Sequence, residues 1–162
     1  MSKTQTTHTI VVDVPVQTAY GQWTQFEQFP AFMGGVQSVR QQGPDQVEWV
    51  VEIAGRKLAY VAKIVEQTPD RKIAWRSVSG KKTGGMVTFR PLTEASTEVT
   101  LDLMYEPEGA LESVADLLGL VAARTRADLQ NFKRYIEGRG VETGAWRGEI
   151  HGGLVEDRPS QF

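Results

Sequence analysis

The stretch YVAKIVEQTPDRKIAWRS, Tyr60 to Ser77, decides the fold class because it contains two alternating apolar runs joined by a turn. Apolar or small side chains occupy every second position: Leu58, Tyr60, Ala62 and Ile64 in the first run, then Ile73, Trp75 and Ser77 in the second. Between the runs, TPDR has its proline second and its aspartate third, an order typical of tight turns. The pattern predicts two antiparallel strands, each with one buried face.

Before this hairpin, the segment VEWVVEIA shows the same alternation, with its apolar face formed by Val47, Trp49, Val51 and Ile53. Near the N-terminus, THTIVVDVP also predicts a strand, whose apolar face holds Ile10, Val12 and Val14. The spacing between these two strands is helical instead, from Ala19 through Trp23 to Phe26. A second short helical piece contains Pro30 and ends at Gly34 and Gly35.

After the hairpin, two further strands are predicted, with apolar faces formed by Val87 and Phe89 and by Val99, Leu101, Leu103 and Tyr105. Counted from Val36, the chain therefore has six successive strands in an antiparallel meander, and the first strand adds a seventh. Beyond Pro107 the period becomes that of a helix, with apolar positions at Leu111, Val114, Leu118, Val121, Thr125, Leu129, Phe132 and Ile136. One long helix of about 28 residues is expected, ending at Gly138.

The composition excludes several functions. The chain has no cysteine, so disulfides, thiolate nucleophiles and cysteine metal sites are ruled out. Its net charge of -2 provides no long-range attraction for nucleic acid. No apolar stretch approaches the roughly 20 residues that a transmembrane helix needs, and the N-terminus lacks a signal-peptide pattern, so a cytoplasmic location is expected.

The length of 162 residues fits one domain, which we place at residues 1–138. Residues 139–162 have no apolar period and are rich in glycine, so they predict a C-terminal tail or a docked loop. Trp146 lies in this tail, and an isolated tryptophan among glycines suggests an anchor that binds either the domain or a partner.

The order of these elements, with FEQFPAFM, YVAKIVEQTPDRKIAWRS and the YEPEG entry into the last helix, resembles the START-like (SRPBCC) superfamily. Within it, the chain is similar to the polyketide cyclase/dehydrase and coenzyme Q-binding branch. The resemblance implies an α+β helix-grip fold, in which a curved seven-stranded antiparallel sheet wraps around the long C-terminal helix and encloses a cavity.

If the sheet wraps the helix in this way, the apolar faces become the walls of a ligand site. The expected ligand-binding residues are Phe32, Met33, Val51, Tyr60, Trp75, Ser77, Phe89, Leu101, Leu103, Tyr105, Leu118, Val121, Ala122 and Thr125. Phe32 and Met33 are placed at the cavity mouth. The alternative is that all these side chains pack against one another as a closed core.

The sequence contains few residues in patterns suited to catalysis or metal binding. Its two histidines, His8 in or before the first strand and His151 in the tail, do not form a metal pair, and no metal or cofactor is predicted. The glycine pairs match no nucleotide-binding motif. Aromatic polyketide cyclases carry tryptophan, serine and arginine together on the strand before the proline turn, whereas this chain has KLAYVAKIVEQ there, and alternation directs Lys63 and Arg76 away from the apolar face.

The leading hypothesis is therefore binding and sequestration of a hydrophobic small molecule, such as a lipid, an isoprenoid quinone or an aromatic polyketide. No catalytic residue is assigned. The first alternative is an aromatic polyketide cyclase/dehydrase, in which an enclosed proton donor or acceptor would assist enolisation and loss of water. The charged candidates for this role are Lys63, Glu66 and Arg76, and the neutral donors are Tyr60 and Tyr105. The second alternative is an adaptor that binds a protein partner through the fold surface or the tail.

Overall fold

The computed structural model describes residues 4–33, 36–43, 45–53, 56–80, 83–105, 114–152 and 154–156. One antiparallel sheet has the order β1-β7-β6-β5-β4-β3-β2, with a short hairpin attached to β4. The strands are β1 (Thr4–Val12), β2 (Val36–Gln41), β3 (Gln46–Ile53), β4 (Arg56–Thr68), β5 (Lys72–Gly80), β6 (Thr83–Thr93), β7 (Ser96–Tyr105), β8 (Glu149–His151) and β9 (Leu154–Glu156). The helices are α1 (Val16–Trp23), the 3-10 helix η1 (Phe26–Ala31) and α2 (Val114–Arg139).

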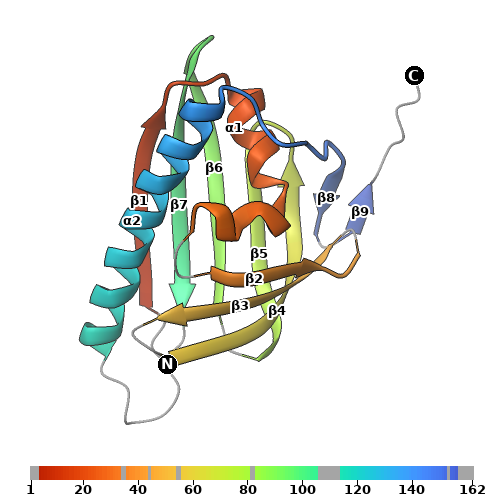
Figure 1. Ribbon diagram of the computed structural model, residues 1–162. Coiled ribbons are helices and arrows are strands. Elements are labelled where there is room, and N and C mark those ends of the chain that lie inside the picture. Colours follow the sequence, from red (N-terminus) through yellow and green to blue (C-terminus); the bar gives the residue numbers. More distant parts are fainter. Residues whose placement is uncertain are drawn as a thin grey trace.

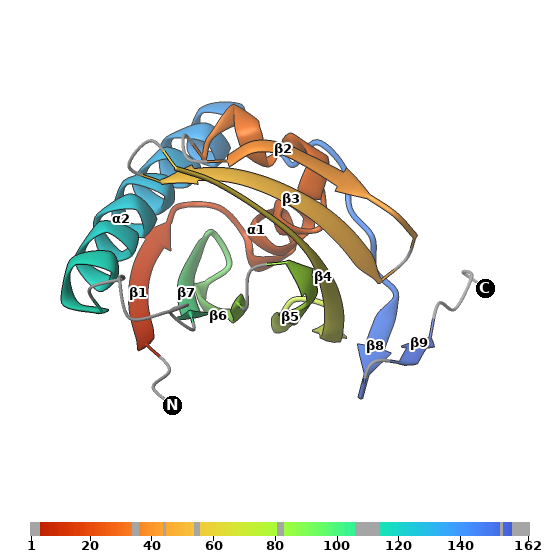
Figure 2. The ribbon, with the colours of Figure 1, turned by 90° about the horizontal axis from the view of Figure 1, so that it is seen from below.

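The predicted seven-stranded meander with a long C-terminal helix is confirmed. The sheet curls from β1 around to β2, with α1 inside the curve, while α2 lies along β1 (Figures 1 and 2). Two register shifts in β4, next to Ala62 and before Glu66, contribute to this curvature, because a bulge bends its strand and increases the twist. The architecture is that of a helix-grip fold.

The predicted turn at TPDR joins β4 to β5. The Arg71 amide donates to the Thr68 carbonyl oxygen over 3.0 Å, and Asp70 has a positive φ of 64°. Aspartate accepts this left-handed conformation more readily than most residues do, which explains why it stands at the third position of the turn.

An aromatic cluster fills the inside of the curve at the α1 end. Trp23 contacts both Phe29 and Phe89, with ring centroids 5.2 Å and 6.5 Å apart. On α2, Phe132 lies 5.5 Å from Trp23, and Leu129 and Ile136 are buried beside it. The apolar stripe predicted for the helix is thus confirmed for its C-terminal half.

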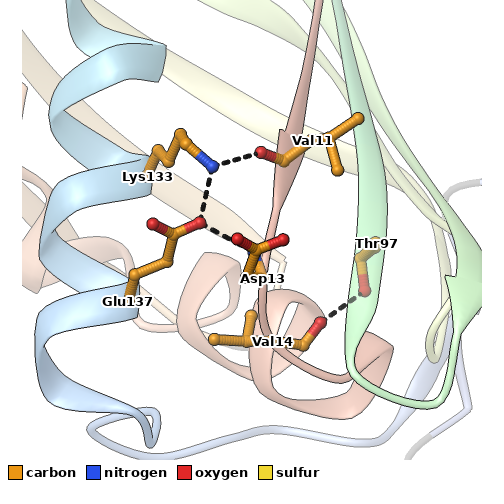
Figure 3. Close-up of polar contacts among 6 residues, drawn as sticks. All are labelled: Val11, Asp13, Val14, Thr97, Lys133 and Glu137. Atoms are coloured by element: carbon orange, nitrogen blue, oxygen red, sulfur yellow. Dashed lines mark hydrogen bonds and ion pairs between the residues drawn. The ribbon is translucent and has the colours of Figure 1, made fainter.

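Polar contacts fasten α2 to the end of β1 (Figure 3). The Lys133 ammonium donates to the Val11 carbonyl oxygen over 2.8 Å and to the Glu137 carboxylate over 2.6 Å. The same carboxylate accepts the Asp13 amide over 2.7 Å. These bonds satisfy backbone groups where β1 ends, so they fix how far the helix lies along the strand.

The described part of the C-terminal segment is docked on the domain. The Gln22 side-chain amide donates to the Thr143 hydroxyl and accepts the Thr143 backbone amide, each over 3.0 Å. Trp146 packs against the core, and Ile150 is fully buried where β8 pairs with Gln67 of β4. Of the two expectations for residues 139–162, docking describes these contacts; the separation of the chain at residue 138 stays a prediction.

Candidate functional site

The inner face of the sheet consists of the side chains that point toward α1, η1 and α2. In each strand these are the alternate residues that the sequence predicts as apolar, while their neighbours face outward. On β7, for example, Val99 and Leu101 are buried, whereas the outward Thr100 hydroxyl lies 3.1 Å from the hydroxyl of Thr9. The inner face is therefore a continuous surface that crosses β1 and β3 to β7.

Burial along this face decreases from one end of the strands to the other. At the α1 end, Ile73, Val87 and Val99 are 1% exposed or less, and on β3 and β4 burial extends further along the strands, to Val47 and Ile64. At the opposite end, Val51, Tyr60, Trp75, Ser77 and Leu103 are only partly buried. We call this second set the open end. Strand register places Trp75 and Leu103 on either side of Gly85, whereas Tyr60 and Val51 lie further along β4 and β3 in the same direction.

Trp75 and Leu103 are brought together at the open end by Gly85. Gly85 is paired with Trp75 of β5 on one side and with Leu103 of β7 on the other. A Cβ atom at Gly85 would lie 2.6 Å from Cζ2 of Trp75 and 3.1 Å from Cδ2 of Leu103. The indole therefore lies directly over the glycine and beside the leucine, because no side chain occupies position 85.

Two hydroxyl groups belong to the open end. The Tyr60 ring stacks on Trp49, with centroids 6.2 Å apart and planes inclined by 13°, and burial raises the pKa of its phenol, which stays protonated at neutral pH. The Ser77 hydroxyl oxygen accepts the Thr83 amide over 3.1 Å, so its proton remains able to donate. The open end is thus apolar with a few hydroxyl donors.

The remaining predicted site residues occupy several positions. Phe32 and Met33 are buried, and the Phe32 ring lies 5.4 Å from Phe132 and 4.9 Å from Tyr135, so it joins η1 to α2. Whether these two residues also border a cavity stays a prediction. Deeper positions on the inner face are held by Phe89 and Leu101, each 5% exposed.

On α2, Thr125 is buried and Ala122 is half-buried, one turn nearer the N-terminus of the helix. Leu118 and Val121 belong to the same helix and Tyr105 ends β7, but their side chains lie outside the described residues.

Sequence reasoning missed two polar residues on the inner face. His8 and Thr6 of β1 are half-buried and alternate with exposed neighbours, in the same phase as Ile10 and Val12. Extending the apolar face of the first strand backwards by two and four residues would have found them. The imidazole Nε2 lies 2.7 Å from the Thr6 hydroxyl.

The charged candidates for acid-base chemistry lie elsewhere. Arg76 is exposed, and Lys63 forms an ion pair with Asp45 over 4.0 Å. Glu66 binds His151 of the docked segment over 2.7 Å. Within the described ranges, no cluster of acidic and histidine side chains is arranged to hold a metal ion.

Residues 12–134 match the family described as polyketide cyclase/dehydrase and lipid transport. The chain belongs to this family. The predicted START-like superfamily is thus confirmed, whereas its coenzyme Q-binding branch stays a prediction. No helix in the described ranges has the length and apolar character needed to cross a bilayer.

Other proteins resemble this chain in sequence or in fold. An uncharacterized 17.2 kDa protein from the melC2-rnhH intergenic region of Streptomyces lincolnensis is 44% identical over 151 residues, covering 93% of this chain and 99% of that protein. A crystal structure from Deinococcus radiodurans has 26% identity and a TM-score of 0.67, over 84% of this chain and 98% of the other. The Zhui aromatase/cyclase of a Streptomyces species has 17% identity and a TM-score of 0.72, over 85% and 96% of the two chains, and this likeness concerns the fold alone.

Proposed function

We propose that the protein binds a hydrophobic small molecule, of the lipid, isoprenoid quinone or aromatic polyketide class, between the open end of the sheet and the N-terminal half of α2. The observation that carries this proposal is the burial gradient of the inner face. Large apolar side chains such as Trp75 and Leu103 remain partly exposed there, although the same strands are fully buried at their other end. A ligand that covers them would complete the burial.

The inward residues of α2 support the same location. Toward the α1 end these are the large Leu129, Phe132 and Ile136, whereas the preceding turns include the small Ala122, which is half-buried, and Thr125, which is buried. We infer that small side chains at these positions favour space for a ligand between this part of the helix and the sheet. The family description, which includes lipid transport, agrees with this function.

The energy available from apolar contact is moderate. Covering about 300 Å² of apolar surface at about 25 cal/mol/Å² contributes about 7.5 kcal/mol, from which at least about 4 kcal/mol of association cost is subtracted. Larger ligands, or hydrogen bonds from groups such as Tyr60 and Ser77, are needed for micromolar affinity.

The test uses matched pairs of neighbouring residues on opposite faces. Leu103→Trp and Ala122→Trp place an indole at the proposed site, whereas Met104→Trp and Ala123→Trp place it at exposed positions. We expect the two inner variants to reduce binding of 1-anilinonaphthalene-8-sulfonate at least about tenfold, and the two outer variants to leave it unchanged. Equal binding by all four variants, or no uptake by the unmodified protein together with empty solvent extracts in mass spectrometry, would contradict the proposal.

Aromatic polyketide cyclisation and dehydration is the second candidate. It is favoured by the position of the Tyr60 phenol at the open end, where the neutral hydroxyl can donate a hydrogen bond to a ligand carbonyl that is to enolise. The distribution of cyclised products from a poly-β-ketone, with the protein and with its Tyr60→Phe variant, tests this candidate. Products identical to those of the uncatalysed reaction would remove it.

A further inference from the structure

The inner-face residues His8 and Thr6 are polar and half-buried, although the residues paired with them on β7, Leu101 and Leu103, are apolar. Their neighbours show which way they point. Thr7 binds Asp102 and Thr9 binds Thr100, all four on the outer face. Thr6 and His8 must therefore point inward, because successive side chains of a strand face opposite sides.

Strand register places this pair beside the open end. Thr6 is paired with Leu103, Leu103 with Gly85, and Gly85 with Trp75, so these residues form one row across β1, β7, β6 and β5. His8 is paired with Leu101 in the next row. With about 5 Å between strands, the row spans about 15 Å from Thr6 to Trp75. The indole shortens this span because it lies over Gly85 toward Leu103.

Only one ring nitrogen of His8 forms a hydrogen bond among the described residues. Nε2 shares a hydrogen bond with the Thr6 hydroxyl, and the other ring nitrogen has no hydrogen-bond partner among the residues that the structure describes. A neutral imidazole paired with a hydroxyl can present either a donor or an acceptor at its second nitrogen, depending on the tautomer. It can therefore bind either a carbonyl or a hydroxyl oxygen.

The surroundings of His8 favour the neutral form. Burial and then the positive charge of Arg126 on α2 lower its pKa. On β7, the residues that face it are the apolar Leu101 and Leu103, while the carboxylate of Asp102 points outward. No counter-charge on these facing residues stabilises an imidazolium.

We propose that the second ring nitrogen of His8 is a polar contact of the ligand site, and that it binds a hydroxyl or carbonyl oxygen of a ligand whose apolar rings lie on Leu103 and Trp75. This inference rests on the proposed binding function and narrows it to apolar ring compounds that carry an oxygen at one edge. A purely hydrocarbon ligand would leave the imidazole unused.

The test compares two probes that differ by one hydroxyl group, naphthalene and 2-naphthol, by calorimetric titration of the full chain. We expect the unmodified protein to bind 2-naphthol about five- to tenfold more tightly than naphthalene, as one additional hydrogen bond allows. In His8→Leu the two affinities should become equal, with naphthalene binding unchanged within about twofold. His151→Leu, which removes the other histidine of the chain, should keep the full ratio.

A second measurement separates ligand contact from a structural role. The chain has two histidines, so the His151→Gln variant leaves a single imidazole in the NMR spectrum. Saturating 2-naphthol should shift the His8 ring resonances and its titration midpoint more than naphthalene does. If His8→Leu does not fold, His8→Gln, which keeps a polar group, provides the affinity ratio instead and should reduce it.

The outcomes distinguish the two proposals. If neither probe binds the unmodified protein, the binding function and this inference both fail. If both probes bind but the hydroxyl gives no preference, or the preference survives in the His8 variants, only the assignment of His8 is overturned.

Discussion

Gly85→Ala is the substitution that most directly tests the geometry of the open end. The added methyl group would lie 2.6 Å from Cζ2 of Trp75 and 2.8 Å from the carbonyl oxygen of Asp102. Carbon atoms in contact are normally about 3.5 to 4.0 Å apart, so the indole must retreat by about 1 Å or more. The Asp102 oxygen belongs to the neighbouring strand and cannot move without disturbing the pairing of β6 with β7.

The expected cost follows from these two clashes. Overpacking a well-packed site costs about 1 to 3 kcal/mol, and we expect about 2 kcal/mol because one of the obstructing atoms is backbone. For a chain of this length, that loss lowers the melting temperature by about 4 to 8 °C. Urea unfolding followed by circular dichroism measures the free energy, and a thermal scan measures the shift.

Two comparisons separate the clash from a general effect of replacing glycine. Gly138→Ala adds the same methyl group where no atom lies within 4 Å, and it should leave the stability unchanged or raise it by up to about 1 kcal/mol. Trp75→Leu removes the obstructing ring. In the double variant Gly85→Ala/Trp75→Leu, the loss should be smaller than the sum of the single losses by about 1 kcal/mol.

Two results would contradict this geometry. If Gly85→Ala costs less than about 0.5 kcal/mol, or if the two changes are additive, the indole of Trp75 does not lie over Gly85. The row from Thr6 to Trp75 would then lose its aromatic end, and with it the apolar surface on which the ligand is placed.

Two further predictions concern hydrogen bonding and pH. Thr97→Val should lower the free energy of unfolding by about 1 to 2 kcal/mol, because the fully buried Thr97 hydroxyl donates to the Val14 carbonyl oxygen over 2.9 Å. Thr100→Val, on the outer face of the same strand, should cost less, and equal costs in urea titrations would contradict this. The two histidines should give opposite pH dependence. The pKa of His8 lies below its ordinary 6.5, so its contribution is complete above pH 6.5 and is lost as the pH falls through the lowered value. Hydrogen bonds from Glu149 and Glu66 raise the pKa of His151, so its contribution is complete below pH 6.5 and is lost as the pH rises through the raised value. Unfolding of His8→Gln and His151→Gln between pH 5 and 9 checks both signs, and a flat difference from the unmodified protein in either variant would remove that histidine from the account.

The sheet and the long helix could be predicted from sequence because each has a period that a single burial requirement imposes. Every strand with one side against the core must alternate, as Val47, Trp49 and Val51 do, and the strands succeed one another through short turns. The same requirement gives α2 its stripe through Leu129 and Phe132. Local pattern and tertiary structure agree throughout these elements.

The C-terminal segment could not be predicted in the same way, because individual contacts hold it rather than a repeating face. Thr143 is held by one side chain, Gln22, and Arg147 makes two bonds to Asp70, of 2.8 Å and 3.1 Å. The strand β8 has three residues and pairs with β4 at Gln67 and Ile150. A segment this short shows no recognisable alternation, so only the fold reveals where its partners lie.

The sequence predicts which face of the sheet carries the candidate site, but not where on that face the site lies. Alternation puts Ile73 and Trp75 on the same side of β5, and nothing in their spacing shows that the first is 1% exposed while the second is only half-buried. That difference depends on where α1 and the aromatic cluster lie relative to the strands. The same holds for His8, because the role of a polar residue in a strand becomes apparent only when its neighbours on the next strand are known.

The two ends of the inner face differ in how closely their side chains pack, and this difference determines how much stability a substitution costs. At the α1 end, rings such as Trp23, Phe29 and Phe132 contact one another closely, and removing a buried ring of this kind costs about 3 to 5 kcal/mol. At the open end, half-buried residues such as Leu103 have less burial to lose, so truncating them should cost less stability. Leu103→Ala should therefore cost less free energy of unfolding than Phe132→Ala, and equal costs in urea titrations would contradict this difference between the two ends.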